Sequence, residues 1–204
     1  MRTPHDTLTL LDWKRHIFDL YRDVRACDDP RAAHRLWRET RDKLFRTHEQ
    51  SPLPEVKRPS FEGIPYFDYD PAVRFEIALE PADEERYEIA SSRDGTYAFT
   101  RFARAPISLP TGAVELEIYW LEAYGGGVFV PFRDSTSGKT TYGAGRYLLD
   151  TVKGSDLGEV DGKLIIDFNF AYNPSCSYDP RWDCPLAPPP NWLRVPIEAG
   201  ERYP

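Results

Sequence analysis

Two segments in the second half of the sequence are rich in side chains that can bind a ligand or do chemistry. The run from Asp167 to Cys176 holds an acid, two amides, a phenol and a thiol, where a strand that only packs would use valine and isoleucine. Residues 132–147 carry a second polar run. We predict that the two runs converge on one pocket for a small anionic or polar ligand. The predicted lining residues are Arg133, Asp134, Tyr142, Arg146, Asp167, Asn169, Asn173 and Cys176.

The two arginines of the upstream run suit an anionic ligand. A guanidinium binds a carboxylate through two parallel hydrogen bonds, and a nearby acid such as Asp134 can orient it. The same residue types also form internal ion pairs that tie a loop to a sheet. Both interpretations of Arg133 and Arg146 stay open from the sequence.

An enzyme of the hydrolase or lyase type is the alternative to a binding protein. Asp134 or Asp167 would be the general acid or base, and Cys176 would be a nucleophile. Arg133 or Arg146 would then stabilise an anion. A catalytic thiol needs a base such as histidine, and all four histidines lie in the first 48 residues. A Cys–His pair therefore requires the N-terminal segment to fold over the tail.

The sequence predicts neither a metal nor a cofactor. Cys176 and Cys184 lack the short spacing of zinc ligands, and no histidine follows His48. Residues 137–140, Ser-Gly-Lys-Thr, resemble the end of a phosphate-binding loop, but Arg133 stands where the first glycine belongs. We expect the cysteines of the tail to be buried thiols that pack as small apolar groups.

Composition excludes several classes of partner. The 33 Asp and Glu against 26 Lys and Arg give a net charge of −7, whereas nucleic-acid binding needs a basic surface. No apolar stretch reaches the length of a membrane span, and residues 1–6 lack the apolar core of a signal peptide. Three cysteines without a signal indicate cytoplasmic thiols. We predict a soluble cytoplasmic protein without a nucleic-acid or membrane partner.

The N-terminal part of the chain is predicted to be helical. Apolar residues recur every three or four positions over residues 10–24, and Thr9 with Asp12 predicts the start of this helix. Asp29-Pro30 predicts the cap and first turn of a second helix that runs to about His48. The first 60 residues carry a net positive charge although the whole chain is acidic. A scaffold that binds a partner through this arm is a third functional alternative, and the sequence leaves the oligomeric state open.

From residue 61 onward the apolar period changes to two, which predicts strands. Asp94-Gly95 and Asp161-Gly162 have the composition of two-residue hairpin turns. One further strand is predicted over residues 164–171, with Asp167 and Asn169 on one face. That face points either into solvent or into a barrel interior.

These patterns predict an α+β fold in which two N-terminal helices pack on a mainly antiparallel β-barrel or sandwich. We expect a single domain over residues 1–204. It would have a helical arm over residues 1–50 and a β body over residues 61–204 that ends in a proline-rich strap.

Seven blocks of sequence carry a resemblance to a known family. They are residues 128–134, 141–148, 167–169, 171–174, 184–186 and 199–201, with Cys176. They resemble the signature of the family known as domain of unknown function 1684. The resemblance implies a bacterial or archaeal protein of about this length without an established activity. Thr140 and Pro190 stand where members of that family commonly carry glutamate.

Overall fold

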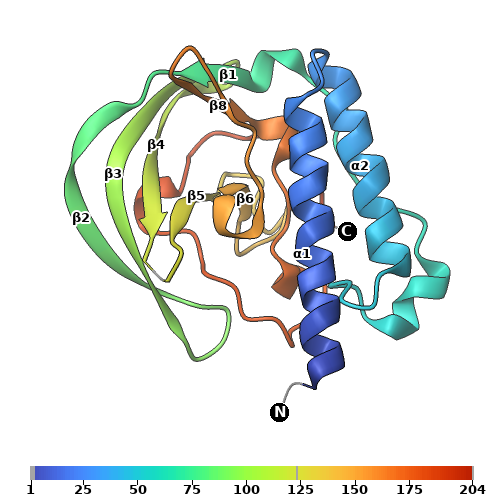
Figure 1. Ribbon diagram of the computed structural model, residues 1–204. Coiled ribbons are helices and arrows are strands. Elements are labelled where there is room, and N and C mark those ends of the chain that lie inside the picture. Colours follow the sequence, from blue (N-terminus) through green and yellow to red (C-terminus); the bar gives the residue numbers. More distant parts are fainter. Residues whose placement is uncertain (1–2, 123, 204) are drawn as a thin grey trace.

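The computed structural model describes residues 3–122 and 124–203. The N-terminal segment folds into α1 (Pro4–Arg25) and α2 (Pro30–Thr47), as the apolar spacing predicts. Figure 1 shows these helices side by side at one edge of the molecule, and they contact one another.

The first helix begins earlier than the sequence indicated. The Thr3 hydroxyl accepts a hydrogen bond from Asp6 N at 3.1 Å, and the Asp6 carboxylate accepts one from Thr3 N at 2.9 Å. The capping box is therefore Thr3–Asp6, and the predicted start at Thr9 is wrong. Proline at position 4 suits the first turn, and the Thr9 hydroxyl bonds back to His5 O inside the helix at 3.1 Å.

Among the described residues, the strands form two antiparallel sheets. The smaller sheet has the order β1-β8-β7, with β1 (Arg74–Ile77), β8 (Lys163–Asp167) and β7 (Glu159–Val160). The larger sheet has the order β2-β3-β4-β5-β6. Its strands are β2 (Glu80–Ala90), β3 (Thr96–Leu109), β4 (Gly112–Leu121), β5 (Gly127–Phe132) and β6 (Arg146–Asp150). In Figure 1, β2, β3 and β4 curve around the side of the molecule opposite the helices.

The sheets decide between the two predicted β architectures. In the described chain β2 and β6 are the outer strands of the larger sheet and do not pair with each other, so the arrangement is sandwich-like and no barrel closes. Both predicted hairpins form, and Asp161-Gly162 is the predicted two-residue turn between β7 and β8. The β2–β3 connection is longer than predicted, because Ala90 pairs with Thr96 and residues 91–95 form the loop, so Asp94-Gly95 is not a two-residue turn. Asp161 and Gly162 both have positive φ, of 50° and 73°, as a tight hairpin turn requires.

The main core lies between the larger sheet and the helical pair. Leu116 and Ile118 of β4 and Leu148 of β6 belong to one buried cluster with Trp37 of α2 and Phe168. This burial of one face of each element holds the helices on the sheet. No helix in the described parts of the chain has the length and apolar character needed to cross a membrane.

Short 3-10 helices join the longer elements. They are η1 (Glu55–Ser60), η2 (Pro71–Val73), η3 (Thr151–Lys153), η4 (Phe168–Phe170), η5 (Ser175–Ser177) and η6 (Pro189–Asn191). The strand predicted over residues 164–171 ends instead at Asp167, where η4 begins. The Asp167 carboxylate accepts hydrogen bonds from Asn169 N and Nδ2, at 2.9 and 2.8 Å. This local bonding competes with the strand ladder, so the strand ends at Asp167. Asp167 and Asn169 are both buried, so they do not point into solvent. They do not point into a barrel interior either, since the described strands close no barrel.

The proline-rich C-terminal strap, called the tail below, comprises the residues after Pro174 and is held to the rest of the chain by hydrogen bonds. Glu201 N donates to Ala171 O at 2.8 Å, and Phe67 N donates to Gly200 O at 2.9 Å. The Asn191 side chain bonds Glu117 of β4 and Pro131 of β5. In Figure 1 the tail, orange to red, reaches from the helices across to those strands. The tail thus ties the two sides of the molecule together.

Candidate functional site

The residues that the sequence grouped into one pocket lie in several places. Arg146 and Asp134 form a buried ion pair, with 2.7 Å between Nη2 and Oδ2. The same guanidinium donates to the carbonyl oxygens of Ile197 at 2.9 Å, Glu201 at 3.2 Å, and Ala199. Both side chains are at most 1% exposed. Both terminal nitrogens of Arg146 therefore bond acceptors within the protein. Of the two interpretations left open by the sequence, the internal ion pair is the one that the structure shows for Arg146.

Arg133 and Tyr142 turn toward the tail. The Arg133 guanidinium lies 4.9 Å from the ring centre of Trp192, which is half-exposed. Tyr142 packs on Tyr203, with 5.1 Å between ring centres, and its hydroxyl lies 3.9 Å from Cys176 Sγ. These groups surround the tail and do not border a cavity with Asp167.

Asn173 belongs to a buried network that includes residues missed by the sequence reasoning. Its N–H donates to Glu201 Oε2 at 2.7 Å, and the Tyr178 hydroxyl donates to the same oxygen at 2.7 Å. Arg41 of α2 pairs with Glu201 Oε1 and donates to the Tyr66 hydroxyl at 2.9 Å. Arg41 follows Trp37 by one helical turn, so its place on the buried side was a usable signal.

A small cavity lies beside this network. It measures about 90 Å³ and is bordered by Tyr21, Arg41, Ser155 and Asn173. Asn173 Oδ1 is buried and has no hydrogen-bond partner among the described residues. The Arg41 charge is already balanced by Glu201, and the space is smaller than the cavity of about 150 Å³ that holds benzene. This cavity suits water or one small polar group.

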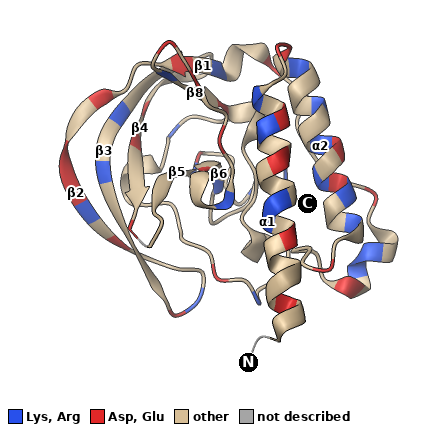
Figure 2. Ribbon diagram, viewed as in Figure 1, with Lys and Arg blue, Asp and Glu red and all other residues tan. Residues whose placement is uncertain are grey.

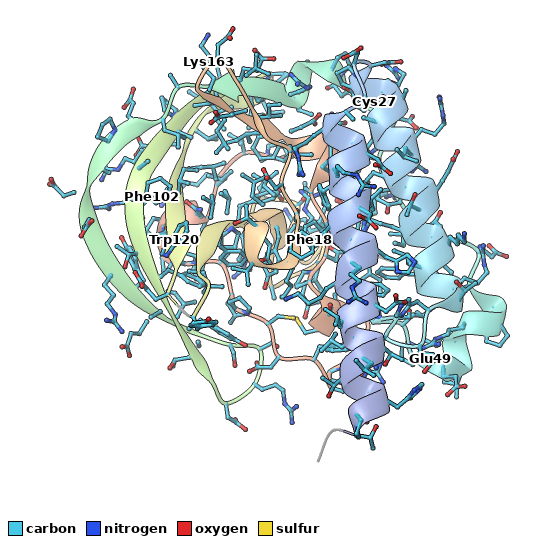
Figure 3. All side chains as sticks on the ribbon, in the orientation of Figure 1. Phe18, Cys27, Glu49, Phe102, Trp120 and Lys163 are labelled. Atoms are coloured by element: carbon cyan, nitrogen blue, oxygen red, sulfur yellow. The ribbon has the colours of Figure 1, made fainter. Side chains whose placement is uncertain are left out.

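A larger polar cleft opens beside Asp167. It measures about 240 Å³ and lies between the smaller sheet and the end of the helical pair. Figure 3 shows Cys27, at the turn between the helices, at the same end of the molecule as Lys163 of β8. We call this space the Asp167 cleft. Its lining residues are Val24, Arg25, Cys27, Asp28, Pro30, Ala33, Arg74, Leu157, Val160, Ile165, Asp167 and Phe170.

Strand pairing places a basic residue next to the acid of the cleft. Arg74 stands opposite Asp167 in the β1–β8 ladder, and its Nε lies 4.0 Å from Asp167 Oδ2. Such a separation gives electrostatic attraction without a hydrogen bond. Residues 74 and 167 are far apart in the chain, so no local sequence pattern indicates this pair.

Asp167 is the most perturbed acid of the site. The residue is 1% exposed, and its Oδ2 is buried without a hydrogen-bond partner in the described chain. Burial raises the pKa of Asp167 from its ordinary 3.8 to about 6, although the bonds from Asn169 and the charge of Arg74 act to lower it. The carboxyl group therefore changes its protonation state close to neutral pH.

Asn169 and His34 hold the turn that carries Asp167. Asn169 Oδ1 accepts a bond from Asp70 N at 2.9 Å, and its Nδ2 donates to Asp70 O at 2.8 Å. His34 of α2, which the sequence reasoning did not select, donates from Nε2 to Asn169 O at 3.0 Å. Burial lowers the pKa of His34 to about 4, so the ring is neutral at pH 7 and acts as a fixed donor.

One group of side chains has the composition of a metal site. Ligand atoms of Asp12, His16 and His48 lie within 4.8 Å of one another. His48 Nδ1 accepts the N–H of Gln50 at 3.0 Å, which places the proton on Nε2, the atom 3.2 Å from Asp12 Oδ2. A metal bound to Nε2 would move the ring proton to Nδ1, and Nδ1 could then no longer accept the N–H of Gln50. Hydrogen bonding therefore explains why these three side chains lie together.

Fold and site together define an α+β protein whose helical pair covers two antiparallel sheets and whose polar cleft lies beside the smaller sheet. The chain belongs to the family described as Protein of unknown function (DUF1684), whose model matches residues 59–202. The family resemblance drawn from the sequence blocks is confirmed. The matched range includes Arg74 and Asp167 but not the helical pair.

A solved structure shares this fold. The chain is similar to an uncharacterised protein of Haloarcula marismortui, whose structure was determined by NMR in solution. The two share 34% sequence identity with a TM-score of 0.55, and the match covers 81% of this chain and 89% of that one. None of the curated proteins compared with the chain matches it.

Proposed function

We propose that the Asp167 cleft binds a small polar molecule. The observation that carries the proposal is that Asp167, a residue that lines this cleft of about 240 Å³, has a buried Oδ2 with no donor within the described residues. Leaving a buried carboxylate oxygen without a hydrogen bond is unfavourable. A ligand that donates a hydrogen bond to this oxygen removes that penalty. The basic partner in this proposal is Arg74, in place of Arg133 or Arg146.

The charges around the cleft define the chemistry of the ligand. Arg25 and Arg74 contribute guanidinium groups, and Asp28 and Asp167 contribute carboxyl groups. The side chains of Arg25 and Arg74 are 36% and 24% exposed, and they also pair with Asp156 and Glu76, respectively. The matching ligand presents a hydroxyl, amide or ammonium donor to Asp167 and a carboxylate or phosphate to Arg74.

The volume of the cleft limits the size of the ligand. A cavity of about 150 Å³ holds benzene, so the 240 Å³ of the Asp167 cleft admits a molecule of about ten non-hydrogen atoms. Small hydroxy acids, amino acids and phosphorylated alcohols have the required size and groups.

Thermal denaturation with a panel of these compounds tests the proposal. A compound at 100 times its Kd adds about 2.7 kcal/mol, which raises the Tm of a chain of this size by about 5–10 °C. At least one compound should do so for the wild type and not for Asp167→Asn. Arg74→Met should lose the response to acidic compounds. Asp94→Asn removes one exposed carboxylate from the β2–β3 turn and should respond as the wild type does.

Two outcomes would contradict binding in the Asp167 cleft. One is a panel in which no compound raises the Tm of the wild type. The other is a compound that raises the Tm of Asp167→Asn by the same amount as that of the wild type, since such a compound binds elsewhere.

A second candidate function is catalysis by Asp167 as a general base. It is favoured by the pKa of about 6, because a base works best near the pH at which it operates. With Arg74 beside it, the carboxylate is placed for proton abstraction next to a carboxyl or carbonyl group. The proton abstracted would be one on the carbon next to that carboxyl or carbonyl group of the bound compound. Proton NMR in D₂O should then show its exchange for deuterium with the wild type and not with Asp167→Asn. Asp134 does not fit this role because Arg146 pairs with it.

The partner-binding alternative finds less support in the helical arm. Leu20, Tyr21 and Val24 of α1 are buried in the core that α1 shares with the sheets. Figure 2 shows basic and acidic residues interspersed along both helices. Arg31, Arg35 and Arg38 of α2 border one groove together with Glu39, Asp42 and Asp68. Acidic side chains therefore offset the positive charge there, and the arm does not present a purely basic docking surface.

A further inference from the structure

Cys176 and Cys184 lie next to each other although seven residues separate them. Cys176 N donates to Cys184 Sγ at 3.4 Å. Because an N–Cα bond is about 1.46 Å long, Cys176 Cα lies at most about 4.9 Å from that sulfur. Both thiols are free. This short distance is compatible with a disulfide between the two residues.

The surroundings hold the position of Cys184. Cys184 N donates to Ser92 Oγ at 3.0 Å, and Ser92 N donates to Cys184 O at 2.8 Å. The next residue, Pro185, accepts a hydrogen bond from the Tyr147 hydroxyl at 2.5 Å. Cys184 is thereby fixed to the β2–β3 turn and to β6, and it is 2% exposed. Cys176 is only partly buried, so it is the thiol that an oxidant reaches.

The two sulfurs differ in acidity. A hydrogen bond from the Cys184 thiol, with others from Ser92 and Tyr142, lowers the pKa of Cys176 to about 6 even though burial opposes this. The same interaction and burial raise the pKa of Cys184. Burial also raises the pKa of Tyr142, which keeps its proton available for donation. At neutral pH the sulfur of the partly buried Cys176 is a thiolate and that of the buried Cys184 is a thiol.

We propose that Cys176 and Cys184 form a peroxide-reactive dithiol, in which Cys176 is oxidised first and Cys184 closes the disulfide. The Cys176 thiolate attacks one oxygen of a hydroperoxide, an S–O bond forms, and the O–O bond breaks. The leaving oxygen takes up a proton and departs as water or an alcohol. Cys176 is now a sulfenic acid, and the peroxide has been reduced.

The second step consumes the sulfenic acid. Cys184 attacks the sulfur of Cys176, the S–S bond forms, and the S–O bond breaks. The hydroxide that leaves combines with the proton of Cys184 as water. An external dithiol reverses the oxidation by thiol–disulfide exchange. This chemistry uses neither Asp167 nor its cleft, so its test is independent of the test of the proposed binding function.

Acidity alone gives Cys176 only a small advantage in rate. At pH 7 a thiol of pKa 6 is about 30 times more ionised than one of pKa 8.5, but its intrinsic nucleophilicity is roughly tenfold lower. The net gain over an ordinary thiol is about two- to threefold. The deciding readout is therefore the product, because an intramolecular Cys176–Cys184 disulfide is expected only if Cys184 lies next to the oxidised Cys176.

The test is treatment of the full chain with hydrogen peroxide, followed by intact-mass measurement and peptide mapping without reduction. We expect the loss of two hydrogens, a peptide linked through Cys176 and Cys184, and reversal by dithiothreitol. Cys27→Ser, the matched control at the far thiol, should behave as the wild type. Cys184→Ser should stop at the sulfenic acid, trapped by dimedone.

Several outcomes would overturn the proposal. They are oxidation of Cys176 to sulfinic acid while Cys184 stays a thiol, a disulfide that contains Cys27, and no change in mass while added glutathione in the same tube is oxidised. The mapping needs only the wild-type chain, so the conclusion does not depend on how well any variant folds.

Discussion

Replacing Asp167 by asparagine should stabilise the protein near neutral pH. The pKa of Asp167 rises from 3.8 to about 6 on folding because the carboxyl group is buried. A group whose pKa is raised by folding contributes stability that is complete below its unfolded pKa and is lost as the pH rises through its folded pKa. The window of this loss is therefore pH 3.8 to about 6. Above it, the wild type bears the full penalty of a buried charge.

The size of the effect follows from the shift. At 1.36 kcal/mol per pKa unit, the rise from 3.8 to about 6 corresponds to about 3 kcal/mol at pH 7.5 and about 1 kcal/mol at pH 4.5. Asparagine imitates the protonated acid, since its Oδ1 can still accept both bonds from Asn169. The variant should thus exceed the wild type by an amount that grows by about 2 kcal/mol between the two pH values.

Urea denaturation of both chains at pH 4.5 and 7.5 measures this difference. All other titrating groups are common to the two chains, so their contributions cancel in the comparison. Asp94→Asn, at an exposed turn position, should differ from the wild type by less than about 0.5 kcal/mol at either pH. A gap for Asp167→Asn that does not change with pH, or a variant less stable at pH 7.5, would refute the reasoning.

Further predictions concern the residues around the cleft and the tail. Because burial lowers the pKa of His34 to about 4, its stability contribution is present above pH 6.5 and is lost as the pH falls through 4. The wild type should therefore lose about 3 kcal/mol more than His34→Gln between pH 7 and pH 4, as measured in urea. Asp134→Asn should cost about 3–5 kcal/mol because it leaves the Arg146 charge buried and unpaired, and a urea midpoint unchanged from wild type would contradict this. Gly200→Ala would place a Cβ 2.4 Å from a backbone oxygen at φ 73°, whereas Gly162→Ala at the same φ meets nothing within 4 Å. The second should cost about 1 kcal/mol and the first clearly more in thermal denaturation; equal losses would show that close approach is unimportant.

The local parts of the fold could be predicted from the sequence. Helix spacing, the cap at Asp29, the β2–β3 hairpin and the two-residue β7–β8 turn depend on residues within a few positions of one another. The start of α1 was misplaced because Thr9-Asp12 and Thr3-Asp6 offer the same capping pattern. Only the proline at position 4 distinguishes the second pair.

The site depends on contacts that no local pattern encodes. Asp167 was recognised as unusual, but its burial results from a 3-10 turn that replaces the end of a strand. Its neighbour Arg74 is placed by the β1–β8 register. Arg41 and Glu201 likewise meet from opposite ends of the chain. In the sequence Arg133 and Arg146 are equally suited to bind a ligand, but in the structure Arg146 donates its hydrogen bonds to Asp134 and to carbonyl groups of the tail.

The most direct test of the central claim is an NMR titration of the ¹⁵N-labelled chain with the compound that most raises the Tm. Binding in the Asp167 cleft predicts shifts of the amide signals of Cys27, Arg74, Ile165 and Asp167, which line it, and their loss in Asp167→Asn. Shifts confined to Tyr21, Ser155 and Asn173, around the smaller cavity, or no saturable shifts at all, would contradict the claim.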